Sequence, residues 1–277
     1  MLNIAVLIFI RKHKIASSNA MLLIRIQTYF DLSMLIIIPI HNFHEMDLIY
    51  DLPFAIFYCY VIFYPHFYGT FTTCSLGILI LLSLDRFMCI VMPLRYKSIT
   101  KQKLYFAIAF ILFLCFLFKG TYLFFMKIDA LTNSFNRTIY NCSSQHLTIE
   151  IMLNLSFTTT LPFILSSILN IITTYVLLKT MRNRHHLNVA LERSTKQTLV
   201  VRFTVANIIS TFLYGFFLFL IIMSYILKFV GVIDVHVRSL YFYNKYLFAC
   251  LTAVNPIVYM ILFKNFRRFM ICKKNIM

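Results

Sequence analysis

The chain has 277 residues, of which 61% are hydrophobic and only 13% are charged, and its formal net charge is +17. Soluble domains are about half apolar and about one-quarter charged, so this composition excludes an ordinary soluble domain and predicts a membrane protein. The apolar stretches are continuous rather than alternating, which favours membrane helices over the short strands of a β-barrel.

The expected helices follow from the apolar stretches, taken in chain order. Residues 1–10 are too few to cross a bilayer, which takes about 20 apolar residues, so we expect them to be the inner half of a truncated first helix. Longer stretches follow at residues 20–39, 54–92, 104–126, 149–178, 199–230 and 240–263. The stretch at 54–92 is long enough to include a loop or a strongly tilted helix. Residues 1–263 are therefore predicted to form one all-α bundle of seven transmembrane helices.

Charge predicts how this bundle is oriented. Most of the 26 Lys and Arg residues lie in alternate loops, whereas most of the nine Asp and Glu residues lie in the other loops. Cytoplasmic loops carry an excess of Lys and Arg, so we predict a multi-pass plasma-membrane protein with its N-terminus outside and its C-terminus in the cytoplasm. The basic excess is then explained by topology and by contact with anionic lipid, and it does not indicate nucleic-acid binding.

Three candidate modification sites agree with this orientation. Sequons of the Asn-X-Ser/Thr form begin at Asn136 and Asn141, in a loop that is predicted to be extracellular, where glycans are attached. Cys272 follows a basic amphipathic stretch at the cytoplasmic end, so it is a candidate for palmitoylation, with an unmodified thiol as the alternative.

Two polar motifs interrupt the apolar stretches near their cytoplasmic ends. Asp85 and Arg86 lie in one, and Asn255-Pro256 with Tyr259 lies in another, shortly before a run of Lys and Arg. Proline and asparagine are costly in a lipid-embedded helix unless neighbouring groups satisfy the freed backbone atoms. Such a site is typical of a helix that moves or binds, so the motifs favour a membrane switch.

These motifs resemble those of the rhodopsin-like (class A) G-protein-coupled receptors, and the resemblance covers nearly the whole chain. Leu84-Asp85-Arg86-Phe87 with Pro93-Leu94-Arg95-Tyr96 is similar to the Asp-Arg-Tyr box and the second intracellular loop. Asn255 to Tyr259 with Phe263-Lys264-Asn265-Phe266-Arg267-Arg268 is similar to the seventh-helix motif and a short amphipathic eighth helix. The resemblance implies a receptor for an extracellular ligand that activates a cytoplasmic heterotrimeric G protein, with residues 264–277 as amphipathic helix and tail.

The resemblance also assigns roles to the motif residues. Arg86 is expected to pair with Asp85 in the inactive receptor and to swing toward other helices on activation, and an Arg–carboxylate pair gives that step a fixed geometry. Asn255, Pro256 and Tyr259 are expected to complete the switch. An ordinary ion pair that anchors a helix end is the alternative reading of Asp85 and Arg86.

A polar site is expected in the middle of the bundle. Asn3 and Asp31 lie 28 positions apart, as the corresponding residues of the family do, and Ser75 lies 11 positions before Arg86. An acid at mid-membrane is costly and usually marks function. With Ser75 and Asn255, Asp31 could hold Na⁺ or water through oxygen ligands, and the alternative is a hydrogen-bonded structural acid. No other cofactor is expected.

The family further implies a disulfide and an aromatic switch. In the family, a disulfide ties the outer loop before the fifth helix to the top of the third, which pairs Cys142 with Cys59, although Cys59 lies 27 positions before Arg86, slightly more than is usual. The chain has no Trp, so the tryptophan of the sixth helix is missing, and Phe212 with Phe216 is expected to replace it.

The sequence leaves the ligand open. Residues 54–83 hold no Asp or Glu, which disfavours an amine, and Ala249 stands where an opsin carries its retinal lysine. A chemosensory ligand and a peptide remain as alternatives. A transporter or channel is the competing class, but it would need more mid-membrane charges and more Gly-interrupted helices. An enzyme is not expected, because the sequence holds no metal-ligand cluster, catalytic triad or phosphate loop.

Overall fold

A computed structural model gives the structure of the chain and describes residues 2–12, 17–44, 51–57, 66–120, 126–132, 138–144, 160–186, 195–231, 237–263 and 266. Its helices are α1 (Leu2–Lys12), α2 (Ser18–His44), α3 (Leu52–Phe57), α4 (His66–Val91), α5 (Pro93–Lys97), α6 (Lys101–Gly120), α8 (Leu161–His186), α9 (Thr195–Phe229) and α10 (Val237–Leu262). Its strands are β1 (Met126–Thr132) and β2 (Thr138–Ser144).

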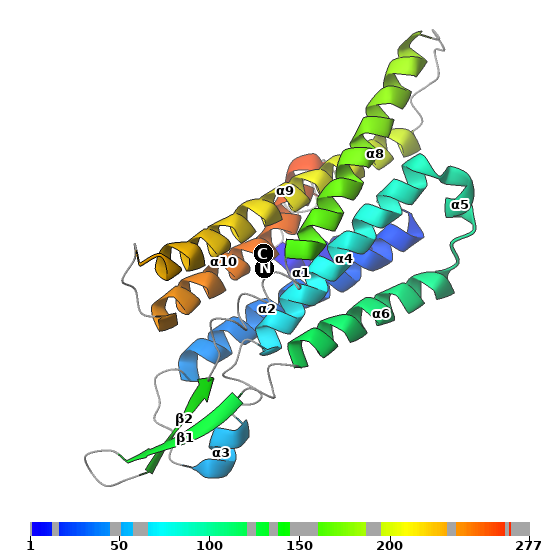
Figure 1. Cartoon of the computed structure of the whole chain (residues 1–277). Coiled ribbons are helices and arrows are strands. Elements are labelled where there is room, and N and C mark those ends of the chain that lie inside the picture. The colour runs from blue at the N-terminus through cyan, green and yellow to red at the C-terminus, as the bar shows by residue number, and fades with distance from the viewer. Residues whose placement is uncertain are drawn as a thin grey trace, which may run out of the picture.

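The helices follow the apolar stretches of the sequence, with three differences. The stretch at 54–92 divides into the short helix α3 and the long helix α4. The stretch at 104–126 ends early, because α6 stops at Gly120 and Met126 already begins β1. α8 continues past its apolar stretch to His186, and Figure 1 shows this end of α8 projecting beyond the other helices.

The long helices pack side by side in a closed arrangement (Figure 1). α1 contacts α2, α2 contacts α4, α4 contacts α8, and α8 contacts α9, while α10 contacts α9, α1 and α2. α4 also contacts α6 and α9, so polar residues of α4 can reach most of the bundle. Over the described residues, this is the predicted all-α bundle, with six long helices (α2, α4, α6, α8, α9 and α10) and the shorter α1.

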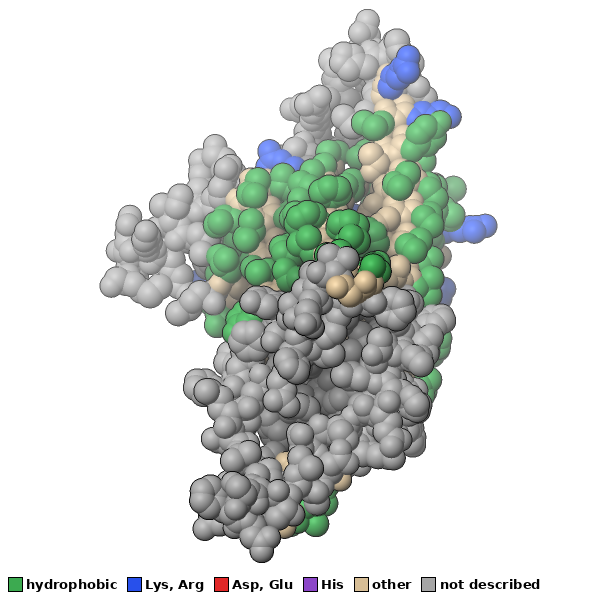
Figure 2. Space-filling model, turned by 60° about the vertical axis from the view of Figure 1, so that its left-hand side comes forward, with side chains coloured by type: hydrophobic (Ala, Val, Ile, Leu, Met, Phe, Trp, Pro, Cys, Tyr) green, Lys and Arg blue, Asp and Glu red, His purple; other side chains and the backbone are tan. Residues whose placement is uncertain are grey.

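The outer surface of these helices suits a lipid environment. Five described segments are long and apolar enough to cross a membrane, namely Asn19–Ile38, Gly69–Val91, Lys101–Phe118, Leu161–Thr180 and Val200–Ser224, with a shorter apolar helix at Thr252–Leu262. Figure 2 shows hydrophobic side chains over much of the visible described surface, with Lys and Arg in its upper part. An apolar surface of this extent is stable against lipid rather than water, so the chain is a multi-pass membrane protein.

The hairpin of β1 and β2 was not expected from the sequence. Its strands are antiparallel, from Met126 opposite Ser144 to Thr132 opposite Thr138. Figure 1 places it with α3 at one end of the bundle, and α3 contacts β2. Because β2 begins Thr138-Ile139-Tyr140, its β-branched and aromatic residues favour a strand. The hairpin lies outside the helical stretches, so the bundle itself remains all-α.

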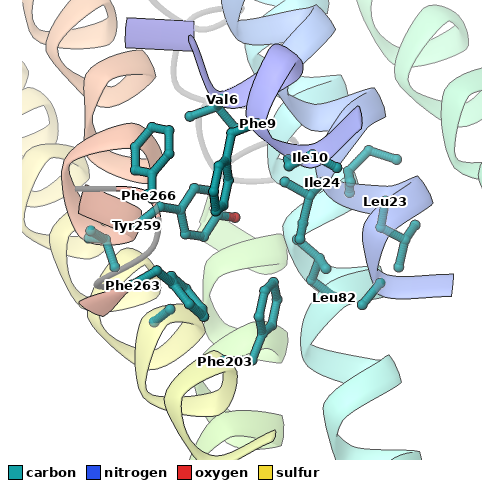
Figure 3. Close-up of a cluster of buried hydrophobic side chains, with 14 of the residues drawn as sticks. Val6, Phe9, Ile10, Leu23, Ile24, Leu82, Phe203, Tyr259, Phe263 and Phe266 are labelled. Atoms are coloured by element: carbon teal, nitrogen blue, oxygen red, sulfur yellow. The ribbon is translucent and has the colours of Figure 1, made fainter. Parts of the chain in front are cut away.

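The apolar core lies where α1, α2, α4, α6, α9 and α10 meet. Figure 3 shows Phe9 of α1, Ile24 of α2 and Tyr259 of α10 within this cluster. Phe9 packs against Phe266, with 4.9 Å between the ring centroids. Lipid is as apolar as these side chains, so close packing and interhelical hydrogen bonds hold the helices together rather than the hydrophobic effect.

Candidate functional site

The first candidate site is a charged pair buried near the C-terminal end of α4. Arg86 and Asp85 are 2% and 7% exposed, and the Arg86 Nη2 atom donates to the Asp85 Oδ2 atom. The structure thus brings together the two residues that the motif predicts to pair. A buried charge that lost its partner would be strongly destabilising, so the pair restrains both side chains.

Two residues that the motifs did not assign complete this site. The Tyr96 hydroxyl of α5 donates to the Asp85 Oδ1 atom over 2.9 Å and lies 3.1 Å from the Ser17 Oγ atom. Ser17 precedes α2, where its hydroxyl accepts from the Ala20 amide and from Arg86 Nη2, the latter over 3.4 Å. Burial and the nearby Asp85 carboxylate raise the pKa of Tyr96 to about 12, so its phenol remains a donor at physiological pH.

An aromatic side chain of α9 covers the guanidinium and packs in turn against rings at the C-terminal end of α10. The Arg86 Cζ atom lies 5.1 Å from the ring centroid of Phe203, which is a cation–π distance. Phe203 stacks on Tyr259, with 6.2 Å between the ring centroids, and Figure 3 shows both beside Phe263. Phe203 of α9 therefore contacts one residue from each predicted motif, Arg86 and Tyr259.

The second candidate site is a polar cluster buried in the bundle. Ser75 Oγ donates to Asp31 Oδ1 over 2.7 Å, and Asn255 Nδ2 donates to Asp31 Oδ2 over 3.3 Å. The Tyr214 hydroxyl lies 3.5 Å from Ser75 Oγ. Asp31 is 2% exposed, and these described partners are neutral. A cation would offset the buried charge, and carboxylate and hydroxyl oxygens are ligands that fit Na⁺.

Asn3 was expected in the polar cluster with Asp31, but it instead hydrogen-bonds to the α10 backbone about one turn from this cluster. Pro256 lies inside α10 and has no N–H, so the Thr252 carbonyl four residues earlier loses its helical partner. The Asn3 Nδ2 atom of α1 donates to that carbonyl over 3.2 Å. Asn3 therefore satisfies the backbone group that Pro256 frees and joins α1 to α10 beside Asn255.

The prediction that Phe212 and Phe216 form the aromatic switch of α9 is wrong. Phe212 and Phe216 are 71% and 51% exposed, so they face away from the bundle. At 100° per residue, Phe212 lies on the opposite side of α9 from Phe203. The aromatic residue buried beside Ser75 is Tyr214, and its helical phase relative to Phe203 is the signal that could have found it.

Other predicted sites involve residues that the structure does not describe. Outside the described residues lie Cys59, Asn136, Cys272 and the segment 264–277 apart from Phe266. Asn141 and Cys142 lie in β2. α3 ends at Phe57, two residues before Cys59, and contacts β2, the strand that carries Cys142.

Comparison with known proteins identifies the family. The family described as 7 transmembrane receptor (rhodopsin family) matches residues 2–259, from α1 to Tyr259 of α10. No curated protein matches the chain. The family match gives no support to a transporter or channel, and receptors of this family bind extracellular ligands and signal through G proteins. Because the match covers nearly the whole chain and the fold is a bundle of long apolar helices, the chain belongs to the rhodopsin family of seven-transmembrane receptors.

Proposed function

We propose that this receptor converts binding of an extracellular ligand into guanine-nucleotide exchange on a cytoplasmic heterotrimeric G protein. The observation that supports this proposal is the buried Arg86, which is held by Asp85 and covered by Phe203 of α9. If α9 tilts outward, Phe203 leaves the guanidinium, and Arg86 becomes accessible to a partner at that end of the bundle. Ligand and G protein are then coupled reciprocally, because both favour the same position of α9.

Variants of the charged pair test this proposal without a known ligand. Asp85→Asn removes the carboxylate charge, and a charge-assisted hydrogen bond contributes roughly 1.5–3 kcal/mol, so basal nucleotide exchange should rise about tenfold or more. Adding Arg86→Ala to Asp85→Asn should return exchange to background. The measurement is energy transfer between labelled G-protein subunits across a panel of Gα subtypes, normalised to surface receptor.

Arg25→Ala is a matched control for the loss of an arginine. Arg25 is partly buried in α2, where its Nη2 atom donates to the Ile10 carbonyl of α1 over 3.3 Å. In the Asp85→Asn background this substitution should leave exchange per surface receptor unchanged. Equal exchange in Asp85→Asn with and without Arg86→Ala would contradict the proposed role of Arg86.

The proposed orientation places the C-terminal end of α4 in the cytoplasm and the hairpin outside the plasma membrane. Support comes from the charges, because the exposed Arg95 and Lys97 lie beside the Arg86 site, whereas Asp129 lies in β1. Cysteines introduced at Asp129 and Arg184 test it in intact cells with a membrane-impermeant thiol reagent. Only Asp129→Cys should react beyond the wild-type background. Reaction of Arg184→Cys would mean that the proposed orientation is reversed.

The outer disulfide and glycans are a linked part of this proposal. If Cys59 and Cys142 are bonded, Cys142→Ser frees one additional thiol that alkylation detects under non-reducing conditions, and Cys59→Ser with Cys142→Ser frees none. Asn136→Gln and Asn141→Gln should each reduce the mobility shift that glycosidase treatment causes.

Cys272 is proposed to be palmitoylated at the cytoplasmic end. Cys272→Ser should therefore remove the palmitate that acyl–biotin exchange detects.

Na⁺ is proposed as an allosteric ion of the Asp31 cluster. A ligand that binds only the folded state raises its stability with concentration, so NaCl should raise the thermal midpoint of the purified receptor relative to choline chloride of equal ionic strength. Asp31→Asn should abolish this difference, and Ser75→Ala should reduce it because Ser75 Oγ lies 2.7 Å from the carboxylate. Equal sodium dependence in Asp31→Asn would exclude this cluster as the ion site.

The ligand class is proposed to be a peptide rather than a small chemosensory molecule. Within the described residues, β1 pairs with β2 on one edge and has no second partner strand. A strand edge offers backbone groups with which an extended peptide can pair. Parallel screening of peptide and odorant libraries against Asp85→Asn and wild-type receptor tests this choice, and a response to odorants alone would reverse it.

A further inference from the structure

Five polar side chains from three helices form a closed ring of hydrogen bonds inside the bundle. They are Ser83 on α4, Ser166 and Asn170 on α8, and Asn207 and Thr211 on α9, and we call them the three-helix ring. Each is at most 5% exposed. None of them belongs to the sequence motifs or to the two sites described above.

The ring closes through side-chain contacts alone. The Ser83 and Ser166 hydroxyls lie 2.7 Å apart, and the Ser166 and Thr211 hydroxyls lie 3.3 Å apart. Asn170 Nδ2 donates to Thr211 Oγ1 over 2.9 Å. Asn207 Nδ2 donates to Asn170 Oδ1 over 2.9 Å and to Ser83 Oγ over 3.0 Å. Each member therefore has two neighbours in the ring.

The sequence places these residues on facing sides of their helices. Ser166 and Asn170 are four residues apart, as are Asn207 and Thr211, so each pair occupies one helix face. A buried polar group without a partner is costly, whereas a fully bonded network in an apolar setting is rigid. The ring therefore favours one arrangement of α4, α8 and α9 over arrangements that separate them.

The ring lies between the polar cluster and the charged pair. On α4, Ser83 is about 12 Å from Ser75 and about 4.5 Å from Arg86 along the helix axis. On α9, Asn207 is about one turn from Phe203, which covers Arg86. An outward shift of α9 separates Asn207 from Ser83, while the contact between α4 and α8 can persist.

We propose that Asn207 and Thr211 are positioning residues for activation, which hold α9 against α4 and α8 through the three-helix ring and thereby limit basal signalling. This restraint is separate from the Arg86–Asp85 pair, because no member of the ring bonds to either of those side chains among the described contacts. The inference rests on the proposed function for its signalling readout, but the position of α9 can be measured without a G protein.

Isosteric substitutions on α9 provide the test and its control. Thr211→Val removes the acceptor for Asn170 without changing volume, so basal nucleotide exchange should rise about fivefold, the factor that corresponds to one net hydrogen bond. Thr204→Val is the matched control, because Thr204 is also buried but donates to the Val200 carbonyl of its own helix over 3.0 Å. Thr211→Ser keeps the hydroxyl and should retain the wild-type basal level.

The position of α9 is measured with spin labels on ketone-bearing amino acids at Arg95 and Arg202, which are both exposed. In purified receptor, the distance distribution should shift to longer values in Thr211→Val and stay unchanged in Thr204→Val. If Thr211→Val does not reach the surface, Asn170→Leu with Thr211→Val removes donor and acceptor together and should give the same shift.

Measuring both nucleotide exchange and label distance separates a failure of the positioning role from a failure of the proposed function. If Asp85→Asn raises nucleotide exchange while Thr211→Val matches wild type in exchange and in label distance, the positioning role is overturned and the proposed function stands. If no variant changes exchange but Thr211→Val still lengthens the label distance, the proposed G-protein coupling fails and the positioning role stands. A fall in basal exchange in Thr211→Val would also overturn the inference, because the ring would then hold the active arrangement.

Discussion

Arg86 of α4 and Phe203 of α9 lie in cation–π contact, with 5.1 Å between the guanidinium carbon and the ring centroid. Farther along the same two helices, Tyr214 of α9 lies 3.5 Å from Ser75 of α4. Phe203 and Tyr214 are eleven residues apart, so they share one face of α9. A rigid tilt of α9 would therefore change the surroundings of the charged pair and of the Asp31 cluster together.

Phe203→Leu is expected to raise basal signalling. The substitution keeps an apolar side chain of similar length but removes the ring face, and a desolvated cation–π contact contributes about 2 kcal/mol. Basal nucleotide exchange should increase by up to about thirtyfold in the G-protein assay, the factor that corresponds to this free energy. Phe212→Leu on the exposed side of α9 is the control and should match wild type. An unchanged basal level in Phe203→Leu would show that the ring does not restrain Arg86.

Tyr96→Phe is expected to weaken the charged pair without removing either charge. The variant loses the hydroxyl that donates to Asp85 over 2.9 Å, and a hydrogen bond to a charged group contributes about 1.5–3 kcal/mol, less solvent screening because Tyr96 is only half-buried. Basal exchange should rise by less than in Asp85→Asn, and the thermal midpoint should fall. A larger effect than that of Asp85→Asn would contradict a supporting role for Tyr96.

The stability that Tyr96 contributes should depend on pH in a defined direction. The folded protein has a pKa of about 12 for this phenol, above its ordinary value of 10.0. Its contribution is therefore complete below the unfolded pKa and is lost as pH rises through the folded pKa. The difference in thermal midpoint between wild type and Tyr96→Phe should stay constant at neutral pH and shrink between pH about 10 and about 12. A difference that already shrinks near pH 7 would contradict this assignment.

Much of the fold could be predicted from the sequence, because long apolar stretches in lipid have few alternatives to helices. The pairs that the motifs imply are also close in space, as Asp31 with Ser75 and Asp85 with Arg86 show. Asp31 and Ser75 lie on the contacting helices α2 and α4, whereas Asp85 and Arg86 are consecutive residues of α4. The hairpin that begins at Met126 was not predicted, because hydropathy alone does not distinguish a strand from the end of a long apolar helix.

The rest of the site could not be predicted because it depends on how the helices face one another. Ser17 and Tyr96 are 79 positions apart, and nothing in the local sequence of either indicates the other. The error at Phe212 arose in the same way, because residue type was considered without helical phase. The three-helix ring had a detectable signal in Ser166 and Asn170, which are four residues apart in an apolar stretch, but its closure requires the rotation of each helix.

Gln27→Leu is expected to stabilise the receptor. Gln27 is 1% exposed, and neither its amide nitrogen nor its amide oxygen has a hydrogen-bond partner among the described residues. An unpaired buried polar group costs about 1–3 kcal/mol, so a leucine of similar size should raise the thermal midpoint of purified receptor. Gln102→Leu on the exposed side of α6 serves as the control and should change the midpoint little. A lower midpoint in Gln27→Leu would mean that the amide has a partner in the membrane-embedded protein.

Gly77→Ala is expected to loosen the contact between α4 and α6. A Cβ atom at Gly77 would lie 2.4 Å from the Ile111 Cγ2 atom, which is far inside van der Waals contact. Isoleucine in a helix has one strongly preferred χ1 rotamer, so this methyl group cannot swing aside, and the helices must separate at a cost of about 1–3 kcal/mol. The thermal midpoint should therefore fall in Gly77→Ala. Ile111→Leu removes the Cγ2 methyl while conserving volume, so the double variant should recover most of the loss in a double-mutant cycle. Additive effects of the two substitutions would show that α4 and α6 do not meet at these residues.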